Sequence, residues 1–425
     1  MNDLLTFIAE SPSRFHAVEN LGRELQAAGY TRLAESQTWL LTPGGKYYVT
    51  RNGSALLAFR VPKEDFTGFM ISASHSDAPT FHVKENAELA GPEGYVRINT
   101  ERYGGMLCAP WLDRPLTVAG RVLVQTADAI ESRLVYVDQD LLLIPNVAVH
   151  MNREANNGYK YDAKCDTIPL MGLGEEKGTF RALVAKAADC APEDILGTDL
   201  YLCLRQRGLT WGAEGEFLSS PRLDDLQCAY GCFRGFLAAP DSGSVPLYAL
   251  LDNEEVGSLT KQGADGTFLS DAVDRICAAL GRERATAVAN SFMVSADNAH
   301  AVHPNHPEYH DATHRPAMNG GVVIKHGVRY ATDGPAQAVF TALCKKAGVP
   351  VQHFSNRSDL AGGGTLGLIA NAHVSMNTVD VGLAQLAMHS CFETAGARDT
   401  DYLIQAMTAF YGASFREVNG RFTLE

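Results

Sequence analysis

The sequence predicts an α/β fold, with helices on both sides of a mixed, mostly parallel sheet and a β-rich segment inserted into it. Near both ends of the chain, apolar strand-like runs alternate with helical patterns, which is typical of a sheet covered by helices. The middle of the chain instead carries short β-rich pieces between Gly- and Asn-rich loops. At 425 residues the chain is also too long for one ordinary core. We therefore expect two domains.

The N-terminal elements have local signals of their own. Residues 13–30, "SRFHAVENLGRELQAAGY", have the apolar spacing of a helix, with Ser13 as its cap. Residues 44–62, "GGKYYVTRNGSALLAFRVP", predict a hairpin that turns at Asn52-Gly53. Residues 66–79, "FTGFMISASHSDAP", predict a buried strand that runs out into polar residues.

The character of the chain changes twice, and these changes set the expected domain boundaries. From about Asn86 to Phe217, β-rich pieces such as "LTVAGRVLVQT" and "SRLVYVDQDLLLI" dominate. After "FLSSPRLDD" the alternation of strands and helices returns, as in "VPLYALLDN", "SFMVSAD" and "AVFTALCKKAG". We expect one α/β domain built from residues 1–85 and 218–425, with residues 86–217 as the insertion.

Composition restricts the class of function. Hydrophobic residues make up 46% and charged residues 20%, as in ordinary soluble globular proteins, and no 18-residue apolar run predicts a membrane span. The net charge of −13 argues against nucleic acid or an anionic membrane as the partner. The nine cysteines include no C-x-x-C pair, and the first residues lack the pattern of a secretory signal. We expect a cytoplasmic protein.

Acidic and histidine side chains follow several of the predicted strands. Ligands of open α/β sheets bind beyond the carboxyl ends of the strands, and oxygen and imidazole groups gathered there suit zinc or a similar divalent ion. Each motif alone has a simpler explanation, as a surface pair, a helix N-cap or a solvated acidic face. Their shared placement favours a metal site. The residues are His75, Asp77, Asp224, Asp225, Glu254, Glu255, Asp297 and His389.

The same motifs carry a resemblance to a known family. "SASHSDAP", "PRLDD", "LLDNEEVGS", "VSADNAHAVHPN", "GGVVIKHGVRYATD" and "VDVGLAQLAMHS" resemble, in the same order, the motifs of the aspartyl aminopeptidase family of dizinc metallo-aminopeptidases. The resemblance covers nearly the whole chain and includes "YGGMLCAPWLDRPLTVAGRV" in the insertion. It implies a metallopeptidase domain with an inserted dimerisation domain, and removal of unblocked N-terminal Asp or Glu from peptides by a metal-activated water.

The resemblance also implies a role for each residue at the strand ends. Two divalent ions are expected, zinc first, with cobalt or manganese as alternatives. Glu254 would be the general base, and Asp77 would orient His75. The expected ligands are Asp224 as the bridge, His75 and Asp297 for one ion, and Glu255 and His389 for the other. The family's bridging motif is often Asp-Asn, so Asp225 adds a negative charge that could change the metal preference.

Three further residues are expected to act on the substrate. By resemblance, Lys325 pairs with the acidic side chain of the substrate's first residue, and His150 reaches the active site of a neighbouring subunit to steady the oxyanion. Asp359 is expected to contact the substrate or its neighbours. The implied assembly is a homo-oligomer whose dimers build a tetrahedral dodecamer. The histidines between His300 and His314 are expected to be loop residues.

Other functions fit part of the sequence. A related dizinc enzyme could have neutral specificity, or could be a carboxypeptidase or deacylase in which Lys325 holds a carboxylate. Gly362, Gly364 and Gly367 form a G-x-G-x-x-G pattern, which raises a dinucleotide-binding oxidoreductase as a remote alternative. However, the polar stretch "SNRSDLA" separates these glycines from the preceding apolar run, whereas the dinucleotide motif requires a strand immediately before it.

Overall fold

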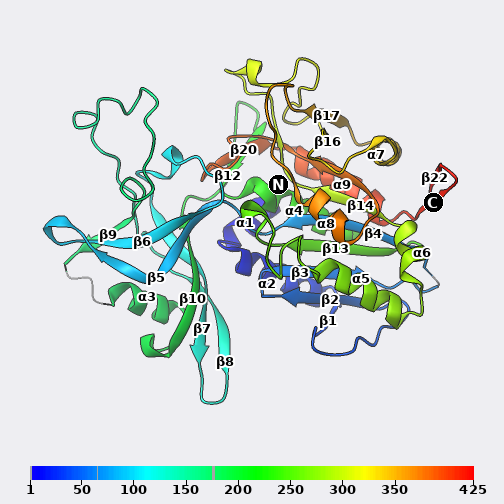
Figure 1. Cartoon of the computed structure of the whole chain (residues 1–425), viewed down its shortest axis with the longest axis horizontal. Coiled ribbons are helices and arrows are strands. Elements are labelled where there is room, and N and C mark those ends of the chain that lie inside the picture. The colour runs from blue at the N-terminus through cyan, green and yellow to red at the C-terminus, as the bar shows by residue number, and fades with distance from the viewer. Residues whose placement is uncertain (1, 65, 175–177) are drawn as a thin grey trace.

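The computed structural model describes residues 2–64, 66–174 and 178–425. Figure 1 shows two parts, a helix-covered sheet on the right and a β-rich part on the left. The helix-covered part contains elements from both ends of the chain, whereas the β-rich part is formed mainly by the middle of the chain. The expected α/β fold with a β-rich insertion is confirmed.

The main sheet has nine strands and is mixed. Its central strands β13, β4, β14 and β18 are parallel to one another, whereas β3 runs antiparallel to β13 and β16 runs antiparallel to β18. The strand order is β1 (Thr31–Arg32), β2 (Lys46–Arg51), β3 (Ala55–Arg60), β13 (Val245–Leu251), β4 (Phe69–His75), β14 (Phe292–Ala296), β18 (Asn377–Gly382), β16 (Val322–His326) and β17 (Val351–Ser355).

Helices cover both faces of this sheet, and two separate clusters of buried side chains lie beneath them. Strand β3 contributes side chains to both clusters: Leu56 points into one and Leu57 into the other, because successive side chains of a strand point to opposite faces of the sheet. One face carries α1 (Asn2–Glu10), α2 (Arg14–Ala27), α4 (Leu223–Ala238), α7 (Gly334–Ala347) and α9 (Asp399–Tyr411); the other carries α5 (Phe268–Ala279), α6 (Arg284–Ala289) and α8 (Leu366–His373).

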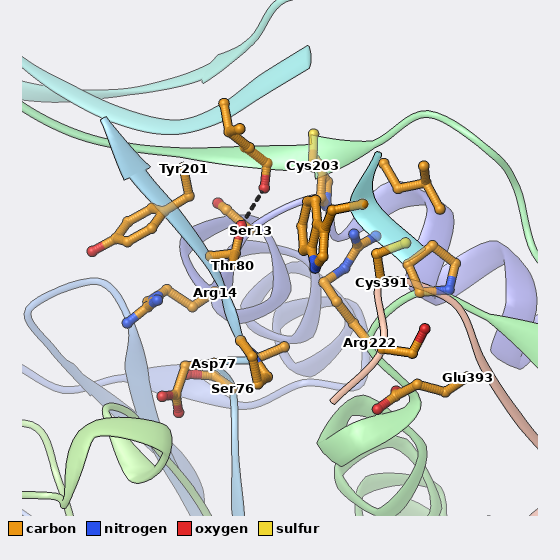
Figure 2. A pocket seen from close by; sticks show the side chains of 18 residues that line it. Ser13, Arg14, Ser76, Asp77, Thr80, Tyr201, Cys203, Arg222, Cys391 and Glu393 are labelled. Carbon is orange, nitrogen blue, oxygen red and sulfur yellow. Dashed lines mark hydrogen bonds between the residues drawn. The ribbon is translucent and has the colours of Figure 1, made fainter. Parts of the chain in front are cut away.

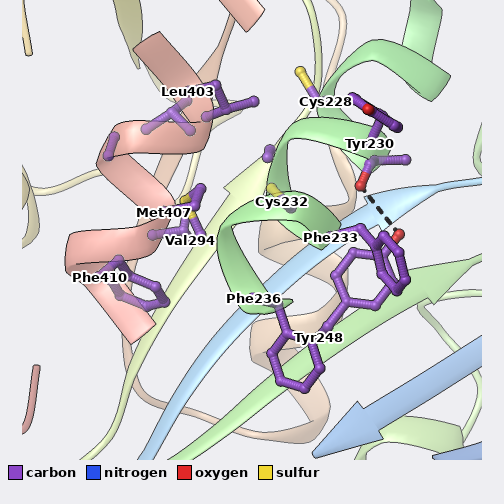
Figure 3. Close-up of a cluster of buried hydrophobic side chains, with 14 of the residues drawn as sticks. Cys228, Tyr230, Cys232, Phe233, Phe236, Tyr248, Val294, Leu403, Met407 and Phe410 are labelled. Carbon is purple, nitrogen blue, oxygen red and sulfur yellow. Dashed lines mark hydrogen bonds between the residues drawn. The ribbon is translucent and has the colours of Figure 1, made fainter. Parts of the chain in front are cut away.

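The first of these clusters anchors α4, the helix that follows one of the candidate ligands (Figure 3). Phe233 and Phe236 of α4 pack against Tyr248 of β13, with ring centroids 5.5 and 6.2 Å apart. Cys228 and Cys232 are fully buried on the same helix, as expected for small apolar residues four apart. Burying one aromatic or aliphatic side chain of this size stabilises the fold by about 1.5–3 kcal/mol. The helix therefore has a fixed position relative to the sheet.

The local predictions for the N-terminal elements are largely confirmed. The hairpin of β2 and β3 turns at Asn52-Gly53, where both residues have positive φ (56° and 66°). The predicted helix is α2, and Ser13 is its N-cap residue. Its hydroxyl makes no capping hydrogen bond to the helix backbone and lies 2.8 Å from His16 Nδ1 instead.

In its described residues, the insertion forms a six-stranded antiparallel sheet with its own core, and the α-helix α3 (Thr179–Ala187) packs against it. Strand β5 belongs to it from Thr80 onward, so the expected boundary at residues 85 and 86 falls within a strand. The predicted strand "SRLVYVDQDLLLI" ends early, and residues 142–144 make only isolated bridges. The order is β8 (Ile130–Tyr136), β7 (Leu116–Gln125), β10 (Ile195–Leu204), β5 (Thr80–Ala90), β6 (Tyr95–Tyr103) and β9 (Leu170–Leu173).

A third sheet joins distant parts of the chain near the interface of the two parts. Its five strands are short, and Phe217–Ser220 spans the second expected boundary. The order is β11 (Leu209–Trp211), β12 (Phe217–Ser220), β20 (Glu393–Gly396), β19 (Ala384–Leu386) and β15 (Ala299–His300), and β21 (Phe415–Val418) pairs separately with β22 (Arg421–Leu424). None of the helices in the described ranges has the length and apolar character that crossing a bilayer demands.

Candidate metal centre

The central parallel strands bring His75 and Asp297 to one edge of the main sheet. His75 is the last residue of β4, and Asp297 follows β14 directly. In the sheet His75 pairs with Leu251, the last residue of β13, so the loop that begins at Asp252 leaves the sheet at the same level. Acids and imidazoles therefore do meet at the carboxyl ends of the parallel strands.

Asp224 reaches this edge from the segment that joins β12 to α4. Arg222 has a left-handed conformation (φ 57°), and Asp224 and Asp225 have non-helical dihedral angles although they lie within the bounds of α4. The peptide bond between these two aspartates is cis. The segment turns sharply enough to present Asp224 to the end of β4.

The two oxygens of Asp224 face different imidazoles. Asp224 Oδ1 lies 3.4 Å from His75 Nε2, and Asp224 Oδ2 lies 3.5 Å from His389 Nε2. On the first side, His75 Nε2 lies 3.9 Å from Asp297 Oδ1. On the second, His389 Nε2 lies 3.3 Å from Glu255 Oε2. The arrangement has two halves that share one carboxylate.

These residues fit a divalent cation. Asp224 Oδ1, Asp225 Oδ1 and Glu255 Oε1 are buried without a hydrogen-bond partner, although buried carboxylate oxygens are costly to leave unpaired. One ligand atom from each of Asp224, Glu255 and His389 lies within 4.8 Å of the others, and the same holds for His75, Asp224, Asp225 and Asp297. Imidazole nitrogens and carboxylate oxygens at such separations are the donors that zinc uses.

Hydrogen bonds fix the tautomer of His75. Its Nδ1 lies 3.0 Å from the backbone carbonyl oxygen of Asp77, which can only accept, so Nδ1 carries a proton and Nε2 is the nitrogen that faces Asp224. The carboxylate of Asp77 lies slightly farther from Nδ1, at 3.4 Å. The orientation of His75 by Asp77 therefore comes chiefly from the Asp77 backbone, whereas the sequence suggested the side chain.

The Asp77 carboxylate instead holds the loop with the paired glutamates. It accepts the backbone N–H groups of Glu254 (3.1 Å) and Glu255 (3.2 Å) and the hydroxyl of Tyr103 (2.7 Å). Burial opposes ionisation of Asp77, but its hydrogen bond with His75 and the charge of Arg14 lower its pKa to about 2. Asp77 thus ties the end of β4 to the short 3-10 helix η4 (Glu254–Val256).

Burial raises the pKa of three carboxyl groups at the site. Burial raises the pKa of Glu254 to about 7 and also raises the pKa of Glu255. Burial likewise raises the pKa of Asp225, whose Oδ2 accepts the backbone N–H of His75 (3.1 Å). A cation at the site would favour all three carboxylates. Glu254 differs from Glu255 in that it belongs to no ligand group with Asp224.

Several supporting residues escaped the sequence analysis. Glu393 accepts the backbone N–H groups of Asp224 (3.0 Å) and His389 (2.7 Å), and burial raises its pKa to about 8. Arg14 donates to Asp252 (2.9 Å) and to the hydroxyl of Tyr103 (2.6 Å). Only Asp252, at the end of an apolar run, had a signal of the kind that identified the ligands. The others lie in segments that look like an ordinary helix or strand.

A small cavity lies between the insertion and the ligand segments (Figure 2). It has a volume of about 40 Å³ and is lined by Asp77 on one side and Glu393 on the other. Arg14, Tyr201 and Arg222 also face it. The cavity is large enough for one or two waters, so the residues that support the two halves of the site line one small space.

The predicted substrate residues lie in three different settings. Lys325 is buried, and its Nζ lies 3.5 Å from Asp297 Oδ2, next to the ligand group. Burial alone would lower the pKa of Lys325, but the charge of Asp297 raises it above its usual value. Asp359 is exposed and pairs with Arg357 (2.6 Å) in the loop before α8. His150 is exposed in a loop of the insertion and belongs to none of the ligand groups found in residues 2–64, 66–174 and 178–425.

The glycine pattern has a packing explanation. Residues 356–365 separate the end of β17 from the start of α8, so no strand leads directly into the glycines. At Gly367, inside α8, an added Cβ would lie only 2.3 Å from Asp380 Oδ1. The glycine is therefore required by the close approach of α8 to β18. The dinucleotide alternative loses its structural basis.

A helix-covered α/β sheet, with imidazoles and carboxylates gathered at the ends of its parallel strands, defines the class of metallohydrolases. The aminopeptidase I zinc metalloprotease (M18) family model matches residues 7–411. The chain belongs to this family and is a zinc metallo-aminopeptidase, which confirms the resemblance found in the sequence. The carboxypeptidase, deacylase and oxidoreductase alternatives do not agree with this membership.

Individual relatives span nearly the whole chain. A probable M18 family aminopeptidase 2 from Clostridium novyi is 41% identical over 423 residues, which cover 96% of this chain and 98% of the relative. Another from Ectopseudomonas mendocina is 40% identical, covering 96% and 97%. Among solved structures, the S. cerevisiae mApe1 dodecamer matches with a TM-score of 0.86 at 30% identity, covering 96% of this chain and 95% of that one.

Proposed function

We propose that this enzyme removes N-terminal aspartate or glutamate from peptides with a centre of two metal ions. One observation carries the two-ion proposal: the two oxygens of Asp224 face His75 and His389 separately, at 3.4 and 3.5 Å. A single carboxylate between two imidazole-containing halves is the geometry of a bridging ligand. His75 and Asp297 would complete one half, and Glu255 and His389 the other.

The general base in this proposal is Glu254. Its carboxylate lies near His75 and Glu255 but belongs to neither of the two ligand groups that contain Asp224. Burial raises its pKa to about 7, and a general base works best when its pKa lies near the pH of the reaction. When bound, the ions would acidify the attacking water and polarise the scissile carbonyl. Glu254 would accept the proton of that water and pass it to the leaving amine. Asp77 would keep Glu254 in place through its backbone N–H.

The acidic preference is proposed to come from Lys325. Its ammonium group is buried and lies next to Asp297, and its Nζ is 5.8 Å from the centroid of the Tyr330 ring. A carboxylate on the first residue of the substrate would gain a charge-assisted hydrogen bond in a site with little water. Asp359 remains a predicted substrate contact, and in the free chain its carboxylate is held by Arg357.

The proposed assembly places the insertion against a second subunit. The loop of residues 145–160, here called the His150 loop, is almost entirely exposed, including Val147, Val149 and Met151. Exposed apolar side chains grouped in this way are suited to an interface. Together with the dodecamer known for the yeast relative, this supports a homo-oligomer, with dimers forming a tetrahedral dodecamer, in which His150 serves a neighbouring active site. Such an enzyme would degrade short peptides in the cytoplasm.

The proposal is tested on peptides that start with Asp, Glu or Leu and are otherwise identical. Dialysed protein would be assayed with and without a chelator, and again after zinc, manganese or cobalt is added. We expect cleavage of the Asp and Glu peptides only when metal is present, with two equivalents of metal per chain at full activity. Preference for Leu would contradict the role of Lys325, and full activity with one equivalent would contradict the bridge.

A further inference from the structure

Three histidines converge on the edge of the main sheet, on a different side of β16 from the ligand groups described above. His326 ends β16, and His353 lies in the neighbouring edge strand β17. Ile324 pairs with His353 in the parallel register, and His326, two residues farther along, points to the same face. Lys325 lies between them in sequence and points to the opposite face, toward Asp297. The histidine cluster is therefore distinct from the candidate metal centre.

The ring nitrogens of His326 and His353 lie close enough to share one ligand. Nε2 of His326 is 2.9 Å from Nδ1 of His353, which is a hydrogen bond between two imidazoles. Two nitrogens bound to one tetrahedral zinc ion, at about 2.0–2.1 Å each, are about 3.3 Å apart. A small opening of this pair would admit an ion. Burial lowers the pKa of both rings, which keeps them neutral near pH 7, the form that binds metal.

The third histidine, His314, is oriented as metal-binding histidines usually are. Its ring centroid lies 6.4 Å from that of His326, and its Nδ1 lies 2.9 Å from Asp311 Oδ1. Metal-binding histidines almost always donate their second ring nitrogen to a carboxylate or carbonyl in this way. Asp311 Oδ1 is itself held by the backbone N–H groups of Thr313 and His314, each at 2.9 Å. Nε2 of His314 is the nitrogen left for an ion. Its ring would have to move toward the other two, because the three rings do not yet have the ligand-atom separations, within 4.8 Å, found at the sheet edge.

We propose that His314, His326 and His353 form an additional binding site for a borderline divalent transition-metal ion such as zinc. The ion would take the place of the proton shared by His326 and His353, with His314 as the third nitrogen and water as the fourth ligand. Imidazole nitrogen is the donor that zinc, copper and nickel prefer, and three imidazoles with one open position are a familiar zinc arrangement. The proposal does not depend on the substrate or on the number of ions at the active site.

The test counts zinc bound to the zinc-loaded enzyme at increasing free zinc, by elemental analysis after desalting and by calorimetric titration. Wild-type protein is expected to take up one equivalent more than the His326→Ala and His353→Gln variants. His314→Ala and Asp311→Asn are expected to weaken that equivalent about 10- to 100-fold. His373→Ala is the matched control, because His373 is also paired with a carboxylate (Asp265, 2.7 Å) but lies away from the cluster.

A second measurement keeps the test valid if a variant folds poorly. An ion that binds only the folded state raises the melting temperature, so zinc should stabilise the wild type and the His373→Ala control more than His353→Gln, whose residue lies half-buried in an edge strand. Equal zinc content and equal zinc-induced shifts in all variants would overturn the proposal. A loss of the additional equivalent in the His373→Ala control would overturn it as well.

Discussion

The carboxyl edge of the main sheet is buried and held by contacts within one chain, whereas the His150 loop is exposed. At the sheet edge, His75, Asp224 and Glu255 are buried or nearly so, and backbone N–H groups and neighbouring side chains fix them. In the His150 loop, Val147, Val149 and Met151 are 51%, 49% and 85% exposed. The first region needs a cation to satisfy its unpaired oxygens, whereas the second presents apolar groups that stay exposed within the described part of the chain.

The largest expected effect concerns the two adjacent glutamates at the sheet edge. Glu254→Gln should lower kcat by about 10²–10⁴-fold, because it removes the general base, while metal content stays the same. Glu255→Gln should lose metal as well, because its carboxylate forms a ligand group with Asp224 and His389, to which Glu254 does not belong. Kinetics combined with elemental analysis of the two proteins separates these outcomes.

The exposed Glu308 gives a matched control for both variants. Glu308→Gln should have normal rate and metal content, because its carboxylate is exposed, pairs with His306 on the surface and belongs to none of the ligand groups found in the described residues. If Glu254→Gln and Glu255→Gln lose rate and metal to the same extent, the proposed division of roles is wrong.

The next largest effect is a change of specificity at Lys325. Lys325→Ala should lower kcat/KM for Asp peptides by about 10- to 150-fold relative to Leu peptides, the value of a hydrogen bond to a charged group. Competition assays on mixed peptides measure the ratio directly. Lys346→Ala, an exposed lysine near the end of α7, should leave it unchanged. A uniform loss on all peptides would mean that Lys325 only neutralises Asp297.

A smaller effect is expected at Asp77, which supports the edge without belonging to a ligand group. Asp77→Asn should weaken metal binding about 10- to 100-fold, as is common for residues behind metal ligands. Its side chain would keep one acceptor for the N–H groups of Glu254 and Glu255. Chelator competition gives the affinity, with Asp241→Asn on the surface as control. If the metal affinity does not change, Asp77 supports the site only through its backbone carbonyl.

The smallest effect tests the incomplete region. Inactive His150→Ala and Glu254→Gln proteins would be mixed under conditions that allow subunits to exchange. If His150 acts on a neighbour, half of the dimers are mixed and each contains one intact site, so about a quarter of the wild-type activity should return. If His150 serves its own chain, no activity returns. Mixing His82→Ala with Glu254→Gln controls for the exchange itself.

The sequence predicted the two regions unequally, and the reasons are physical. Strands β4, β13 and β14 are long apolar runs, so both their existence and the polar residues at their ends could be predicted. His389 follows a strand of only three residues and has φ of 67°; its place after an apolar run made it a candidate, and the family resemblance supplied its role as a ligand. The third sheet was not predicted, because strands of two to four residues have too few positions for a periodic pattern.

The supporting residues show a second limit. Tyr103 ends a strand of the insertion and Arg14 begins α2, yet both contribute to the hydrogen bonds that hold Asp77 and Asp252. Nothing in their local sequence indicates this, because the contact spans 89 residues between Arg14 and Tyr103 and 238 between Arg14 and Asp252. Contacts of this kind follow from the fold as a whole.

The central position of β4 has a consequence for how the protein is made. Phe69 pairs with Val245 of β13 on one side, and Met70 pairs with Phe292 of β14 on the other. Both partner strands of β4 are therefore synthesised much later than β4 itself. At about 5–20 residues per second the delay is on the order of ten to forty seconds. Meanwhile the insertion, complete by Leu204, can fold on its own antiparallel pairings. During that interval the insertion is folded, whereas the β2–β3 hairpin and β4, which precede it in sequence, still lack their partners in the main sheet. These apolar elements are the segment on which a chaperone would act.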